Sequence, residues 1–112
     1  MAGEALRERL AGELRAAMKA RDAVAIATLR SLLSAIDNAS AVAETSAHVP
    51  VFGRSGDVPR RELTIPDIER VLSGEAAERT AAVDDYERRG LREGVDRLRA
   101  ELGIIMRFLS AY

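Results

Sequence analysis

The carboxylate pair Asp84-Asp85 is the first feature of the chain whose residue types could do chemistry. Two neighbouring carboxylates suit general acid–base catalysis. Neighbouring residues of a helix, however, point about 100° apart, and an arginine follows each of these two aspartates four residues later. That spacing is typical of ion pairs on a solvated helix face. We therefore do not expect a reactive centre here.

The sequence also gives no evidence for a catalytic nucleophile, a metal-binding site or a phosphate-binding loop. Ser31 and Ser34 have no base near them in the sequence. The chain has no Cys and one His, His48, which excludes Cys-based zinc sites, and no acidic cluster has calcium-loop spacing. The run Gly-Arg-Ser-Gly at 53–56 is not followed by Gly-Lys-Ser/Thr, as a phosphate-binding loop would be. The sequence predicts no catalytic residue, no metal site and no cofactor.

Basic side chains are the remaining candidates. A net charge of −1 is too low for a general nucleic-acid binder, but residues 1–21 carry five basic and three acidic groups, whereas residues 64–112 carry eight and ten. Any polyanion site is therefore local, and ordinary solvated charge is the alternative. Phe52 is the only aromatic residue in a predicted loop, so contacts would be made to phosphates rather than to stacked bases. The candidate residues are Arg15, Lys19, Arg21, Arg30, Arg60 and Arg61.

The elements that must position these residues are helices. Aromatic residues make up only 4% of a chain in which Ala, Leu, Arg and Glu, all helix formers, are abundant. Apolar residues recur at three- and four-residue steps, as at Leu6, Leu10 and Leu14. This spacing predicts four amphipathic helices over about residues 4–21, 23–40, 65–89 and 91–109. The predicted fold class is all-α.

Cap and turn residues predict how these helices are joined. Asp22 can end the first helix and cap the second. Thr64 with Asp67 three residues later forms a variant of the capping box at the start of the third helix. Gly90 can end that helix in the left-handed conformation. Both joins are short, so we expect two antiparallel helical hairpins in a single domain of residues 1–112.

Residues 41–63, between the two predicted hairpins, look different from the rest. This polar segment has no helical period and is rich in turn and breaker residues. We expect a long surface loop, which is uncommon in a small domain and is either functional or a tolerated insertion.

The run at 104–109 is more apolar than one helix face needs. Ile104, Ile105 and Phe108 are therefore candidate interface residues, and the alternative is that this end of the chain closes the core. No apolar run approaches the ~20 residues of a membrane span, and no secretory signal is visible. We expect a cytoplasmic protein without a membrane partner.

Several runs in the same order resemble the GatB/YqeY domain family. They are Leu-Arg-Glu-Arg-Leu at 6–10, Leu-Arg-Ala-Ala-Met-Lys-Ala-Arg-Asp at 14–22, Thr-Leu-Arg-Ser-Leu-Leu-Ser-Ala-Ile at 28–36 and Arg-Arg-Glu-Leu-Thr at 60–64. The stretch from Tyr86 to Leu109 is similar to the last two helices of the family. The resemblance covers most of the chain apart from residues 41–59. Longer members have a second small helical domain, and we expect this chain to be a short form without it.

The resemblance implies a helical domain related to the C-terminal part of the GatB subunit of the tRNA-dependent amidotransferase. That glutamine-dependent carbon–nitrogen ligase converts misacylated Glu-tRNA or Asp-tRNA into Gln-tRNA or Asn-tRNA. Its helical part contacts tRNA while another domain carries out the chemistry, which has no counterpart here. The six basic residues named above match family positions, and the resemblance implies that they are candidate RNA contacts.

Two functions follow as expectations. The first is a non-catalytic tRNA- or RNA-associated accessory domain of translation, whose partner is tRNA or a tRNA-handling enzyme. The second is a helical protein–protein interaction or self-association module, such as a homo-oligomer, that binds no nucleic acid.

Overall fold

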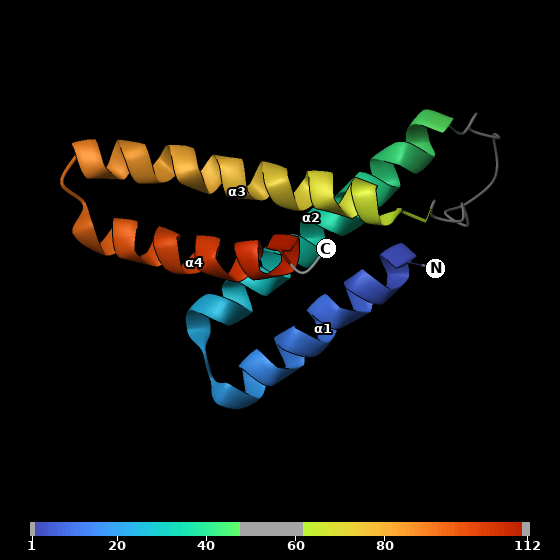
Figure 1. The fold of residues 1–112 in the computed structure, drawn as a ribbon, viewed down its shortest axis with the longest axis horizontal. Coiled ribbons are helices and arrows are strands. Elements are labelled where there is room, and N and C mark those ends of the chain that lie inside the picture. The colour runs from blue at the N-terminus through green and yellow to red at the C-terminus, as the bar shows by residue number, and fades with distance from the viewer. Residues whose placement is uncertain (1, 48–61, 111–112) are drawn as a thin grey trace, which may run out of the picture.

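A computed structural model describes residues 2–47 and 62–110, and this part of the chain consists of four helices and no strand (Figure 1). The helices are α1 (Ala2–Ala20), α2 (Ala23–Ala47), α3 (Ile65–Arg88) and α4 (Arg92–Ser110). The predicted all-α class is confirmed.

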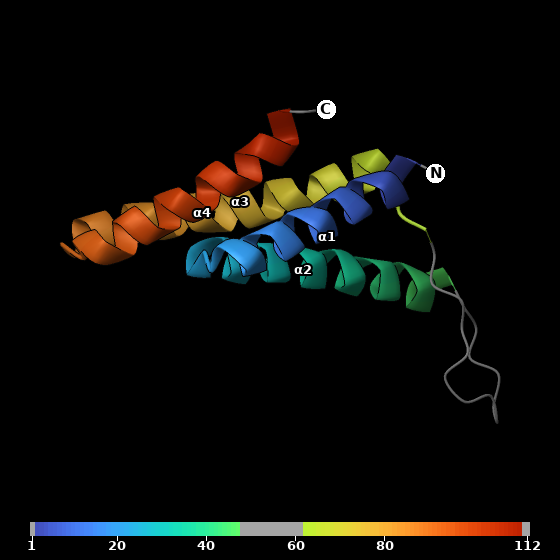
Figure 2. The same ribbon diagram turned by 90° about the horizontal axis from the view of Figure 1, so that it is seen from below.

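The helices form two antiparallel hairpins. Figure 2 shows α1 lying alongside α2, and α3 and α4 run side by side in both views. α2 contacts each of the other three helices. The α3–α4 turn projects beyond the end of the first hairpin (Figures 1 and 2). The two hairpins therefore meet mainly through α2, and the far end of the second hairpin relies on its own contacts.

The core lies where the hairpins meet and is almost entirely aliphatic. Each helix buries most of the apolar stripe predicted from its spacing, but Met18 and Leu91, which share that spacing, are 48 and 42% exposed. A fully buried Leu or Ile contributes roughly 1.5–3 kcal/mol. The apolar side chains with less than 3% of their surface exposed are Leu6, Leu10, Leu29, Leu32, Ile36, Ile68, Leu72, Ile105 and Phe108. The start of α1 lies against the segment that leads into α3. A Cβ on Gly3 would lie only 1.8 Å from the carbonyl oxygen of Leu63, so the close approach requires glycine there.

The α1–α2 turn ends one helix and starts the next within two residues. Arg21, with φ 56°, donates its N–H to the Met18 carbonyl at 3.2 Å, and the Asp22 N–H bonds the Ala17 carbonyl at 3.0 Å. These two bonds make a Schellman ending. The Asp22 carboxylate then accepts from the Ala25 N–H at 3.1 Å and caps α2. The role predicted for Asp22 is confirmed.

The predicted ends of α3 are confirmed. Thr64 and Asp67 form a reciprocal capping box, with bonds of 2.9 and 3.2 Å. At the other end Gly90 has φ 69°, and bonds from its own N–H and that of Leu91 reach the carbonyls of Glu87 and Tyr86. This is a second Schellman ending, with glycine at the left-handed position.

α2 is longer than the sequence predicted. It continues past Ser40 to Ala47, so the loop predicted over 41–63 is wrong for its first seven residues. Residues 41–49 contain neither Gly nor Pro, and Ala41, Ala43 and Glu44 favour helix, so Thr45 and Ser46 do not end the helix. The predictions made for His48, Phe52 and the run 53–56 lie outside the described residues.

The close approach of α3 and α4 gives the first testable prediction. A Cβ on Gly94 would lie 2.3 Å from Cδ2 of the Tyr86 ring, whereas a Cβ on Gly103, in the same helix, would meet nothing within 4 Å. Gly94→Ala should therefore destabilise the fold by roughly 1–3 kcal/mol. Gly103→Ala should stabilise it by about 0.5–1 kcal/mol, because alanine favours helix. Urea unfolding followed by circular dichroism measures both, and equal effects would contradict this packing.

Candidate nucleic-acid interface

Arg15 and Lys19 lie on one face of α1 because they are four residues apart. The buried residues of α1, Leu6, Leu10 and Ala17, turn the opposite side of the helix toward the core. Both cations are exposed, and together with Ala16 and Met18 they line a shallow hollow. Met18 is 48% exposed, so the hollow has an apolar part beside two positive charges.

The register of the first hairpin brings Arg30 of α2 to the same height along the hairpin as Arg15 of α1. Arg7 of α1 donates to Asp37 of α2 at 2.6 Å. Leu14 lies seven residues after Arg7, and Arg30 lies seven residues before Asp37. Seven residues are close to two helical turns, so in an antiparallel pair Leu14 and Arg30 occupy facing positions at one level. Arg15 follows Leu14, which places Arg15 and Arg30 on neighbouring helices at the same height.

Arg21 completes this group at the end of the hairpin. We call Arg15, Lys19, Arg21 and Arg30 the basic edge. Lys19, Arg21 and Arg30 are exposed and have no ion-pair or hydrogen-bond partner for their side chains among the residues that the structure describes. Arg15 lies 3.7 Å from Glu8, and both side chains are about 70% exposed, so that pair is weak.

The basic edge has a defined chemical capacity. Its arginine and lysine side chains are hydrogen-bond donors with positive charge, so they can hold an anion such as a phosphate. The two remaining candidates, Arg60 and Arg61, lie outside the described residues.

Comparison with known proteins identifies the family. A family model described as Yqey-like protein matches residues 7–111. The chain belongs to the Yqey-like protein family. No curated protein and no solved structure matches the chain. The match covers most of α1 and all of α2, α3 and α4, and the resemblance inferred from the sequence is confirmed at the level of the family.

The apolar end of α4 in this Yqey-like chain packs inward. Ile105 is fully buried, Phe108 is 2% exposed, and Ile104 packs partly buried against the core. The guanidinium of Arg9 covers the Phe108 ring at 5.6 Å from its centroid. Of the three candidate interface residues, Ile105 and Phe108 thus close the core. The exposed apolar side chain of this segment is Met106, which the sequence analysis did not single out.

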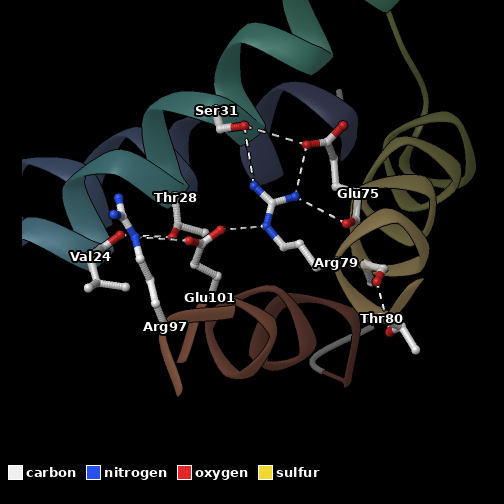
Figure 3. A network of polar contacts seen from close by, with 9 residues as sticks. Val24, Thr28, Ser31, Glu75, Arg79, Thr80, Arg97 and Glu101 are labelled. Carbon is white, nitrogen blue, oxygen red and sulfur yellow. Dashed lines mark hydrogen bonds and ion pairs between the residues drawn. The ribbon is translucent and has the colours of Figure 1, made fainter. Parts of the chain in front are cut away.

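One polar cluster of the Yqey-like fold lies inside the molecule and resembles a catalytic site at first sight. Arg79 of α3 donates to Glu101 of α4 at 2.8 Å, to Glu75 at 3.1 Å and to the Ser31 hydroxyl of α2 at 3.4 Å (Figure 3). Arg97 approaches the other oxygen of Glu101 at 3.5 Å. The side chains of Arg79, Glu75 and Glu101 are only 12, 20 and 16% exposed.

The bonding within this cluster indicates a structural role. Burial alone would lower the pKa of Arg79, but the hydrogen bonds and charges of Glu101 and Glu75 outweigh it and raise the pKa above its ordinary value. The guanidinium therefore stays charged and occupies both carboxylates. In the described part of the chain no buried polar side-chain atom lacks a partner, so the cluster offers no free group to a substrate. It joins α2, α3 and α4.

Helical spacing accounts for part of this cluster, because Glu75 and Arg79 are four residues apart and pair at 3.1 Å. Of the two aspartate–arginine pairs expected from the same spacing, Asp85–Arg89 forms at 3.3 Å, and no ion pair joins Asp84 to Arg88 in the described part of the chain. The bonds from Arg79 to Glu101 and Ser31 cross between helices, and periodicity within one helix carries no signal for them.

The Arg79 cluster yields a second prediction. Removing Arg79 leaves two carboxylates close together in a poorly hydrated site, so Arg79→Ala should cost roughly 3 kcal/mol in the free energy of unfolding. The control Arg97→Ala removes a 63%-exposed partner of the same Glu101 and should cost less than about 1 kcal/mol. Chemical denaturation measures both. A cost for Arg79→Ala as small as that of the control would refute the buried role of this arginine.

None of the helices in the part of the chain that the structure covers is both long enough and apolar enough to cross a membrane.

Proposed function

We propose that this chain is a non-catalytic accessory domain that binds tRNA, or another structured RNA, through its phosphates. The observation that carries the proposal is the basic edge, where three cations face solvent without an acidic partner among the described residues. Family membership supports it, because the resemblance to the helical part of the amidotransferase GatB subunit implies contact with tRNA.

Binding would rest on charge and shape. Phosphate oxygens accept hydrogen bonds from arginine and lysine, and each contact releases condensed counterions from the nucleic acid. Tyr86 is the aromatic residue described besides Phe108, and it lies against Gly94, so no exposed ring in the described ranges serves as a platform for stacked bases. The hairpin fixes the spacing of the cations, and the chain itself makes or breaks no covalent bond.

The setting of this activity would be translation in the cytoplasm. A domain that holds RNA but carries no reactive centre needs a partner enzyme to act on what it holds. We propose a tRNA-handling enzyme as that partner, in line with the family's association with the carbon–nitrogen ligase.

The alternative, a protein–protein interaction or self-association module, would dock on exposed apolar side chains. Met18, Leu91 and Met106 are 42–49% exposed, but they belong to α1, the α3–α4 turn and α4. Single exposed apolar residues on separate elements are ordinary features of a protein surface. We therefore favour RNA binding through the basic edge over protein docking on these apolar side chains.

A salt titration distinguishes the two functions. Unfractionated tRNA is titrated against the protein at several salt concentrations. If Arg15, Lys19 and Arg30 each contact one phosphate, replacing all three by Ala should weaken binding and lower the slope of log affinity against log salt by about three units. Apolar docking would depend little on salt.

The matched control replaces Arg88, Arg92 and Arg107 by Ala. These arginines are also exposed and unpaired within the described ranges, but they belong to the second hairpin. The control therefore removes the same amount of positive charge from another part of the surface. It should leave the salt slope close to that of the native chain. No binding of the native chain at low salt would refute the proposed function. Dimers seen by light scattering without RNA binding would favour the alternative.

A further inference from the structure

The two helical turns of this protein use one backbone motif with different residues at its critical position. In both turns a residue with positive φ follows the helix, and two amide-to-carbonyl bonds of 3.0–3.2 Å close the Schellman ending. Gly90 occupies the position in the α3–α4 turn, and Arg21 occupies it in the α1–α2 turn. Comparing the two turns therefore shows which residue type the backbone needs at the positive-φ position.

The backbone does not require an arginine there. Glycine adopts the left-handed region without penalty, whereas a residue with a Cβ is strained in it. Arg21 is the one residue other than glycine with a positive φ in the described chain. Because glycine serves the same motif in the second turn, the strain at Arg21 is a cost in stability that the fold alone does not explain.

Contacts within the chain do not offset this cost. The Arg21 side chain is exposed, and in the described ranges it forms no hydrogen bond, ion pair or ring contact. A cation near the end of α1 interacts favourably with the helix dipole, but Lys19 already supplies one in the last turn. The neighbouring carboxylate, Asp22, is bonded to the Ala25 N–H.

We infer that Arg21 contacts a phosphate of the RNA backbone at the apex of the α1–α2 turn, and that its charge is retained there at the expense of stability. The inference rests on the proposed function and names the residue where binding and stability conflict. Residues held in sparsely populated backbone conformations cluster at functional sites. Two hydrogen bonds fix the backbone of Arg21 at the turn, so contact with a ligand there would cost little backbone entropy.

Replacing Arg21 by glycine tests this inference, because the substitution should raise the stability of the fold and weaken tRNA binding. Arg21→Gly relieves the strain and should raise Tm by about 4 °C, while it should lower the log–log salt slope of tRNA binding by about one unit and weaken binding several-fold at low salt. Arg21→Gln removes the charge but keeps the strain, so it should weaken binding equally without a rise in Tm. Arg107→Gln, an exposed and unpaired arginine of α4 within the described ranges, is the control for charge alone and should leave the slope unchanged.

The outcomes separate the two proposals. If the native chain binds tRNA and Arg21→Gly binds as tightly, the inference about Arg21 is overturned and the proposed function stands. A lower Tm for Arg21→Gly would also overturn it, because the strain would then be absent. If the native chain binds no tRNA at any salt concentration, the proposed function fails and the inference fails with it.

Discussion

The whole arrangement depends on α2 burying one face against all three other helices. Thr28, Leu29, Leu32 and Ile36 lie on that face and are at most 2% exposed. Because the buried face is committed to the core, the residues opposite it, among them Arg30, must face solvent. A side chain that the core expels in this way is available for a ligand. The packing of α2 thus determines both the stability of the protein and where its free charges lie.

The two hairpins use their charges differently. On the second hairpin, acidic and basic residues pair across helices, as in Arg79 with Glu101 and Arg99 with Glu87, at 2.8 and 2.9 Å. The Arg99–Glu87 pair and the contact of Tyr86 with Gly94 lie toward the α3–α4 turn and hold together the part that projects beyond the core. On the first hairpin, Arg7 pairs with Asp37 near the start of α1, but the cations near the turn lack such partners among the described residues. The second hairpin therefore pairs several of its charges across helices, whereas the cations near the turn of the first hairpin have no cross-helix partner in the described part of the chain.

Local physics explains what the sequence could predict. Helical period, the carboxylate of Asp22, the Thr64–Asp67 box and the glycine at 90 act within a few residues, so their outcome can be read from neighbours in the chain. The common face of Arg15 and Lys19 follows in the same way. The level of Arg30 could not be predicted, because it depends on the tertiary contact between Arg7 and Asp37.

Long-range contacts explain what the sequence could not predict. Arg79 bonds residues 22 and 48 positions away, which no helical spacing reveals. Apolar residues suit a core and an interface equally, so Ile105 and Phe108 were open to both interpretations until packing placed them inside. The left-handed backbone of Arg21 also escapes sequence reasoning, since glycine is the usual signal for it.

Mapping the RNA contact by NMR tests the central claim most directly. At 12.1 kDa the chain suits amide spectra recorded during a tRNA titration at low salt. The account predicts that amide shifts concentrate in the last two turns of α1, the α1–α2 turn and α2 near Arg30, and that added salt reverses them. Shifts concentrated instead on the α3–α4 turn or around Met106, or shifts that persist at high salt, would contradict it.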